Sequence, residues 1–206
     1  MSKFNKKHSL VIMSIIMIMS IFSMTAYAAT GSQGYAVYRD GVFELEWHAA
    51  LMDEPNSAYS LPVMHITGPG GTVDWGTWTE FMDKSTNTFQ GVYKPNGTIS
   101  DYSRDNVVAM GRKLRLENLG YTALSQVDHF VTSSSSWVRP EDLWLIRCDG
   151  VVEYCYEWYG YRIYGSDTLW DITKGGIANL NHHNIANITP KKQAQNWMTK
   201  VQSTKP

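Results

Sequence analysis

Cysteine is scarce in this chain, which has two among its 206 residues, Cys148 and Cys155. The sequence also lacks a block of like charge, and its histidines and cysteines do not have zinc-ligand spacing. No repeat or linker divides it, and no second long apolar run follows the one near the N-terminus. These absences argue against nucleic-acid binding, a zinc site and several membrane spans.

The first 28 residues have the pattern of a secretion signal. Three lysines stand among the first seven residues, residues 10–24 are nearly all apolar, and 26–28 (Ala-Tyr-Ala) form a small-residue cleavage site. The alternative is an uncleaved anchor, but the run is short for a spanning helix. We therefore expect export and cleavage after Ala28, which leaves one domain of 178 residues, 29–206. Without those lysines 15 basic residues face 19 acidic ones, a net charge of −4.

The first half of this domain alternates apolar and polar residues as β-strands do, and the second half has helical spacing. Strands are expected at 35–38, 42–52, 62–67, 72–75 and 91–94, with a tight turn at Asp40-Gly41. Helices are expected at 103–118, at 148–158 and from 189 to about 201, with a short helical turn at 140–145, a short strand at 161–164, and loops at 124–137 and 175–188. An antiparallel meander followed by helices predicts an α+β fold.

Cys148 is the candidate nucleophile. It stands in residues 146–150 (Ile-Arg-Cys-Asp-Gly), directly before a helical pattern. A thiol in the first turn of a helix lies near unpaired N–H groups and the positive end of the helix dipole, which favour the thiolate that attacks carbonyls. The alternative is a buried cysteine that packs as a small hydrophobic residue.

A disulfide between the two cysteines is not expected. On one helix, Cys148 and Cys155 would have Cα atoms ~10.5 Å apart, and a disulfide needs less than about 7 Å. The sequence thus predicts two free thiols in an exported chain. Cys155 is expected mid-helix, in the core.

Two histidines on expected neighbouring strands are candidates to assist the thiol. His48 is the candidate general base, because a base held on a sheet is rigidly placed. His65 is the candidate third residue, which would hydrogen-bond to His48 and orient it. Asp53, Glu54 and Asp74 are alternative orienting groups. Each histidine could also be a plain core or surface residue.

Other histidines and the aromatic residues have weaker interpretations. His129, His182 and His183 lack partners at metal-ligand spacing, which argues against zinc. We expect them to be surface residues, with a role at the edge of a substrate site as the alternative. Several tryptophans are candidates to line a cleft for carbohydrate or peptide, with core packing as the alternative. These are Trp47, Trp75, Trp78, Trp137, Trp144 and Trp158.

Residues 147–154, Arg-Cys-Asp-Gly-Val-Val-Glu-Tyr, resemble the Cys-(Ser/Asp)-Gly-(Leu/Val)-Val motif of the NlpC-type papain-like amidases. Here 47–51 (Trp-His-Ala-Ala-Leu) and 63–66 (Val-Met-His-Ile) precede the cysteine. That order is similar to the circularly permuted, YaeF/YiiX-like branch, with the lecithin retinol acyltransferase family as more distant relatives. The resemblance covers about residues 35–163. Asp149 stands where serine is commoner in the family.

The resemblance implies a papain-like α+β fold in which an antiparallel sheet packs against the cysteine-bearing helix. It implies Cys148 as nucleophile, His48 as base and His65 as the third residue, with no cofactor or metal. We expect a monomeric cysteine amidase or peptidase, secreted or associated with the cell wall, that cleaves peptidoglycan peptides. The alternatives are an acyl hydrolase or acyltransferase on a lipid or lipoprotein with the same three residues, and a non-catalytic wall-binding module.

Overall fold

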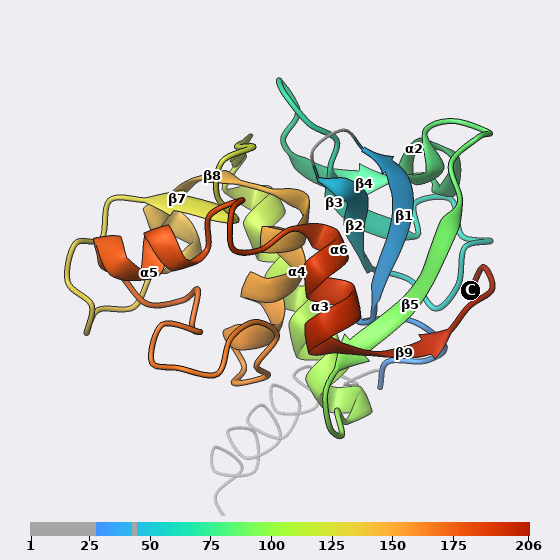
Figure 1. Ribbon diagram of the computed structural model, residues 1–206. Coiled ribbons are helices and arrows are strands. Elements are labelled where there is room, and N and C mark those ends of the chain that lie inside the picture. The colour runs from blue at the N-terminus through green and yellow to red at the C-terminus, as the bar shows by residue number, and fades with distance from the viewer. Residues whose placement is uncertain (1–27, 43–44) are drawn as a thin grey trace, which may run out of the picture.

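Six antiparallel strands form the main sheet, in the order β4-β3-β2-β1-β5-β9 (Figure 1). The computed structural model describes residues 28–42 and 45–206, so the expected secretion signal, except its last residue, lies outside the described residues. The strands are Ala36–Val42 (β1), Glu46–Met52 (β2), Val63–Ile66 (β3), Val73–Gly76 (β4), Phe89–Pro95 (β5) and Met198–Gln202 (β9).

A second, three-stranded sheet lies beside α5 and is joined by a bridge, between Thr72 and Gly120, to the residue before β4 (Figure 1). Its order is β6-β8-β7, with β6 parallel and β7 antiparallel to β8. The strands are Gly120–Tyr121 (β6), Val127–His129 (β7) and Leu143–Ile146 (β8).

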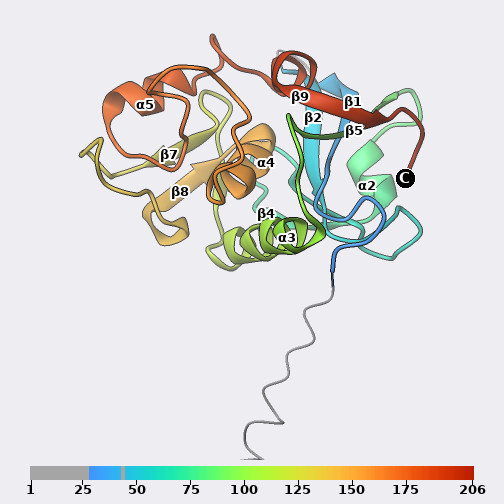
Figure 2. The ribbon, with the colours of Figure 1, turned by 90° about the horizontal axis from the view of Figure 1, so that it is seen from below.

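Helices α3 and α4 lie between the two sheets (Figures 1 and 2). The helices are Trp78–Met82 (α2), Asp101–Leu116 (α3), Cys148–Glu157 (α4), Ile177–His182 (α5) and Pro190–Lys192 (α6), with a 3-10 turn at Pro140–Asp142 (η1) and a π-helical turn at Gln193–Trp197 (η2). The expected α+β class is thus confirmed. In the part of the chain that the structure describes, every helix is too short or too polar to cross a lipid bilayer.

Strand β2 separates two hydrophobic clusters because its side chains alternate between the faces of the sheet. On one face, Ala49 and Leu51 belong to the large cluster that contains Cys148 and most apolar residues of α4. On the other face, Ala50 and Met52 belong to a small cluster that contains Phe81 of α2. The cysteine helix therefore packs on the antiparallel sheet, as expected, and α2 covers the opposite face.

The expected hairpin turn at Asp40-Gly41 is wrong. Strand β1 continues through these residues to Val42, and its register with β2 shifts between Asp40 and Val42, which marks a β-bulge. Gly41 has a positive φ of 85°, which suits glycine at such a bulge. Asp-Gly is a common turn sequence, but here the two residues form a bulge where β1 pairs with β2.

The C-terminal helix is shorter than expected. Thr189 caps α6 through its side chain, as predicted, but helical structure ends at Trp197 instead of reaching residue 201. The segment then forms β9, which pairs with β5 at the edge of the main sheet. Pairing with an open sheet edge outweighs the local helical pattern.

Several smaller expectations also fail. Residues 161–164 are not a strand, the expected loops contain β7 and α5, and the expected turn at 140–145 divides into η1 and the start of β8. The unpredicted helix α2 starts with a capping box, in which Thr77 accepts from the Glu80 N–H and Glu80 accepts from the Thr77 N–H. That Thr-x-x-Glu pattern was a readable helix signal.

Candidate functional site

Cys148 is the first residue of α4, in the position that the sequence predicts. Arg147 precedes it with extended backbone (φ −98°, ψ 163°), so the helix starts abruptly at the cysteine. Both cysteines are free and lie on the same helix. Every residue of α4 is buried, and only 1% of Cys148 is exposed.

The thiol of Cys148 is not stabilised as a thiolate, which corrects the expectation from the helix terminus. Burial, followed by the negative charge of Asp149, raises its pKa to about 12. The backbone N–H groups of Ala49 and Asp149 and the charge of Arg147 act in the opposite direction, but more weakly. At neutral pH the thiol is therefore protonated, and any attack needs a base to remove the proton.

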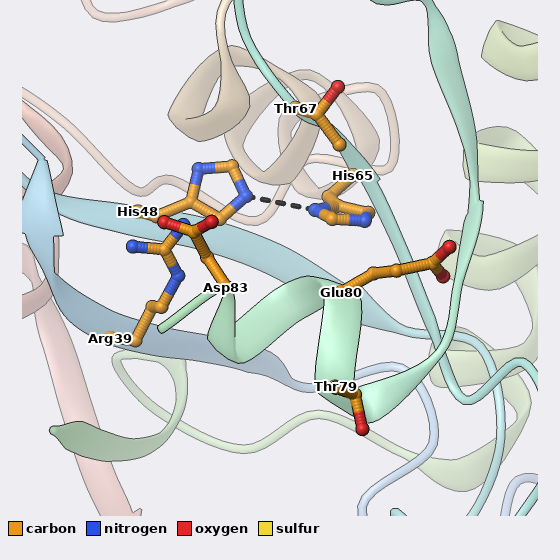
Figure 3. A pocket seen from close by; sticks show the side chains of 7 residues that line it. All are labelled: Arg39, His48, His65, Thr67, Thr79, Glu80 and Asp83. Carbon is orange, nitrogen blue, oxygen red and sulfur yellow. Dashed lines mark hydrogen bonds and ion pairs between the residues drawn. The ribbon is translucent and has the colours of Figure 1, made fainter. Parts of the chain in front are cut away.

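His48 and His65 are hydrogen-bonded across a gap between their strands. Strands β2 and β3 pair at Leu51↔Met64 and Met52↔Val63, and the ladder ends before it reaches the histidines. There His48 Nε2 lies 2.9 Å from His65 Nδ1 (Figure 3). The hydrogen bond expected from neighbouring strands is thus present, and it leaves Nδ1 of His48 as the ring atom available to a partner.

Both imidazoles are held in the neutral form. Burial, together with the nearby His65 and Arg39, lowers the pKa of His48 well below its usual range. Burial and Arg39 lower the pKa of His65 to about 4. Gly76 on β4 allows this placement, because a Cβ there would overlap Nε2 of His65. A neutral imidazole is the form that can accept a proton.

The thiol and His48 approach the same point of β2 from different faces. Cys148 comes from the α4 face, close to the Ala49 N–H, whereas the His48 ring lies on the α2 face with its centroid 5.8 Å from that of Phe81. Among the described residues, no hydrogen bond joins the Cys148 sulfur to His48. The structure therefore brings the two histidines together and places the thiol on the opposite face of β2, where it contacts the Ala49 N–H.

A polar cavity of about 420 Å³ opens over the histidine pair (Figure 3). Sequence analysis did not single out any of its other lining residues. The cavity is lined by Arg39, His48, His65, Thr67, Thr79, Glu80 and Asp83. Because Cys148 is not among them, an attack on a molecule in this cavity requires an opened state in which the thiol reaches it.

Asp83 stands at the edge of this cavity in a strained conformation. It follows α2 with φ 63° and ψ −69°, and a non-glycine residue there typically costs about 1–3 kcal/mol. Its carboxylate lies 3.8 Å from the Arg39 guanidinium, whose Nη1 donates to the Asp40 carbonyl. The cavity thus carries both charge signs on its walls.

Within residues 28–42 and 45–206, none of the three alternative orienting carboxylates hydrogen-bonds to His48, although Asp74 lies opposite His65 in the β3–β4 ladder. Asp53 forms a two-bond ion pair with Arg112, at 2.9 Å for each contact. Asp74 pairs with Arg115 at 2.6 Å, and Glu54 lines a separate cavity with Arg112. His65 is therefore the side chain that holds His48 by a hydrogen bond in the described structure.

A buried ion pair lies directly behind the thiol. The guanidinium of Arg147 donates to both carboxylate oxygens of Asp149, at 2.6 and 2.9 Å, and neither side chain is exposed. Arg147 also donates to the carbonyls of Ala123 and Ile188. Asp149 thus anchors the first turn of α4 from inside the protein.

Glutamine side chains extend this network to distant parts of the chain. Gln126 donates to Asp149 and Glu153, at 3.2 and 2.5 Å. Gln193 donates to the backbone carbonyl of Asp149 (3.0 Å) and to Glu153 (2.8 Å). The Tyr38 hydroxyl on β1 donates to Gln193 in turn. The network fixes the turn that carries Cys148 against the main sheet and the C-terminal segment.

His129 and His183 are buried, which corrects the expectation that they lie at the surface, and His182 is partly exposed. His183 is 1% exposed, with Nδ1 2.8 Å from the Gln126 side-chain oxygen and Nε2 3.2 Å from the Leu169 carbonyl. His129 is buried, and His182 stacks on Tyr164. The described residues contain no group of three or more histidine, cysteine or acidic side chains that could hold a metal ion.

We expect acid to destabilise the fold through His65. Its folded pKa of about 4 lies below the ordinary 6.5, so the unfolded chain binds a proton that the folded chain excludes. The stabilisation is complete above pH ~6.5 and falls as the pH drops to about 4, by about 3 kcal/mol for this group. Urea unfolding at several pH values should show this slope, which should be shallower in His65→Asn. Equal slopes in the two proteins would contradict the assignment.

We compared the chain with known protein families, curated proteins and solved structures. No protein-family model, curated protein or solved structure matches the chain.

Proposed function

We propose that this protein is an exported cysteine amidase that cleaves peptide amides of the cell wall and has a circularly permuted, papain-like arrangement of its site. One observation carries the proposal. The Cys148 thiol at the start of a buried helix meets the backbone of Ala49, the residue after His48, whose ring lies on the other face of β2 and is held by His65 through a 2.9 Å hydrogen bond. The chain order of two histidine strands before a cysteine helix packed on an antiparallel sheet agrees with the permuted arrangement.

The protonation states suit a mechanism that starts from a neutral Cys148 thiol and a neutral His48 imidazole. The proposal requires the opened state, in which the thiol reaches the face of β2 that carries the His48 ring. There, because the pKa of Cys148 is raised and that of His48 is lowered, the proton moves from sulfur to His48 Nδ1 as the thiol attacks, not beforehand. For Nδ1 to accept it, the neutral His48 ring carries its proton on Nε2 and donates to His65 Nδ1. His65 then fixes both the tautomer and the ring orientation.

The reaction proceeds through a thioester. The sulfur bonds to the amide carbon, and the negative charge that forms on the oxygen is held by the unpaired Cys148 N–H at the start of α4. When the carbon–nitrogen bond breaks, His48 returns its proton to the leaving amine. His48 then removes a proton from water, which hydrolyses the thioester and frees the thiol.

In the opened state in which the thiol reaches the cavity over the histidines, the walls of that cavity favour a polar substrate over a lipid. Its walls carry the charges of Arg39, Glu80 and Asp83 and the hydroxyls of two threonines. An acyl chain buried there would leave these groups without partners, which is unfavourable. This observation supports the amidase over the lipid hydrolase or acyltransferase.

Replacing the base tests the proposal. In His48→Asn we expect hydrolysis of soluble peptidoglycan stem peptides to fall by about 10²–10⁴-fold, because the thiol proton has no acceptor. Product peptides measured by mass spectrometry give the rates. His182→Asn, which alters a histidine on α5, is the control and should keep the activity. Full activity of His48→Asn would sink the proposed mechanism.

A further inference from the structure

Two tryptophans meet at the far end of the cysteine helix. Trp158 ends α4, and the exposed Trp137 lies beside it with ring centroids 5.7 Å apart and planes inclined by 60°. The two indoles form a corner that opens into a cavity of about 310 Å³, lined by Trp137, Arg139 and Trp158. Because α4 has ten residues, the corner lies ~15 Å along the helix from Cys148.

The walls of this corner are fixed from behind. Trp158 stacks on Tyr154 with centroids 5.8 Å apart, and the Tyr154 hydroxyl donates to the Val138 carbonyl at 2.7 Å. The Val138 N–H donates to the Thr173 carbonyl, at 2.8 Å. The neighbouring Trp137 is therefore held by a paired backbone segment. Walls that are already ordered lose little entropy when a ligand binds.

Two cations flank the indoles. The Lys174 ammonium lies 3.1 Å above the centroid of the Trp137 ring. The exposed guanidinium of Arg139 has no hydrogen-bond or ion-pair partner within residues 28–42 and 45–206. The nearby acids are already engaged, because Asp142 accepts from the Arg139 backbone N–H and Glu141 pairs with Lys113. The N–H groups of the Arg139 guanidinium are thus available to a ligand beside the two indole rings.

We propose that this corner binds a pyranose ring that carries a carboxylate. The apolar C–H face of the sugar would pack on an indole, and the carboxylate would accept two hydrogen bonds from the Arg139 fork. Three residues line an open cavity, so one side of the ligand stays in water. A sugar presents hydroxyls there, whereas an aromatic acid would leave an apolar face wet. The site is independent of the amidase chemistry.

Binding of two related sugars tests this site. We expect N-acetylmuramic acid to bind saturably, as followed by tryptophan fluorescence, and at least about tenfold more tightly than N-acetylglucosamine, which lacks the carboxylate. Trp137→Ala should weaken both sugars. Arg139→Gln should remove only the preference for the acidic one. Trp144→Ala, which alters an exposed tryptophan stacked on Phe130, is the matched control and should bind like the unaltered protein.

Each failure has a distinct meaning. Equal affinity for the two sugars, or an Arg139→Gln variant that keeps the preference, overturns the recognition of a carboxylate. A loss of binding in Trp144→Ala equal to that in Trp137→Ala, or no saturable signal up to tens of millimolar sugar, overturns the site itself. Cys148→Ala should bind normally, which separates this test from that of the amidase. Unchanged circular dichroism in the variants establishes that they fold.

Discussion

Replacing Cys148 by alanine is expected to lower kcat/KM for amide hydrolysis by at least about 10³-fold, because an alanine methyl group cannot form the thioester. The matched control is Cys155→Ala. Cys155 is also buried and lies on the same helix and in the same hydrophobic cluster, but the proposed mechanism gives it no role. Rates of stem-peptide cleavage, measured beside the unfolding temperature of each variant, separate a chemical defect from a folding defect.

Thiol labelling gives the same comparison a second measurement. The Cys148 thiol is buried and its pKa is raised to about 12, so iodoacetamide should react with it only through the opened state, slowly at neutral pH. The pKa of Cys155 is raised further by burial, so it should react more slowly still. An unlabelled Cys148 in a protein that binds wall fragments without cleaving them would instead identify a binding module. Undiminished cleavage by Cys148→Ala would refute the nucleophile.

Removing the charge of Asp149 is expected to lower the free energy of unfolding by about 3–5 kcal/mol. Asp149→Asn leaves the guanidinium of Arg147 without its counter-ion in a site where neither side chain is exposed. The cost comes from an uncompensated buried charge, so Arg147→Met combined with Asp149→Asn should recover part of the loss. Urea unfolding of the single and double variants measures these differences.

Asp74→Asn is the matched control for burial. Asp74 accepts from Arg115 at 2.6 Å, the same distance as the contact between Arg147 Nε and Asp149, but its side chain is 59% exposed. Breaking that pair should cost less than about 1 kcal/mol, since water solvates both charges. If the two asparagine variants lose equal stability, the buried pair does not have the role that we assign to it.

The sequence predicts local structure best where pattern and tertiary environment agree. Helix α4 was predicted to start at Cys148 because a helical apolar pattern follows a polar step, and the structure starts it there. The segment after Trp197 was mispredicted as helix, because its partner β5 lies about 100 residues away and no local pattern reveals it. At Asp40-Gly41, a typical turn signal instead forms a bulge inside β1, where the register with the adjacent strand β2 shifts.

The candidate site was predictable in its residue types but not in its electrostatics. Strand spacing placed His48 and His65 on neighbouring strands, and their hydrogen bond is present. The helix terminus suggested a thiolate at Cys148, yet burial outweighs the dipole and raises the pKa. Asp149 and Arg147 looked like a polar helix start. Only the structure shows that they form a buried ion pair, because burial depends on the packing of the whole folded chain.

The hydrogen bonds from Gln193 to the Asp149 carbonyl and Glu153 also set an order of assembly. Gln193 follows every residue of the candidate site along the chain. Because a polypeptide is synthesised from its N-terminus, the turn that carries Cys148 lacks this anchor until Gln193 has been added. A partly synthesised chain would thus hold a thiol that is not yet set in place. The setting of Cys148 is therefore complete only once residue 193 has been added to the chain.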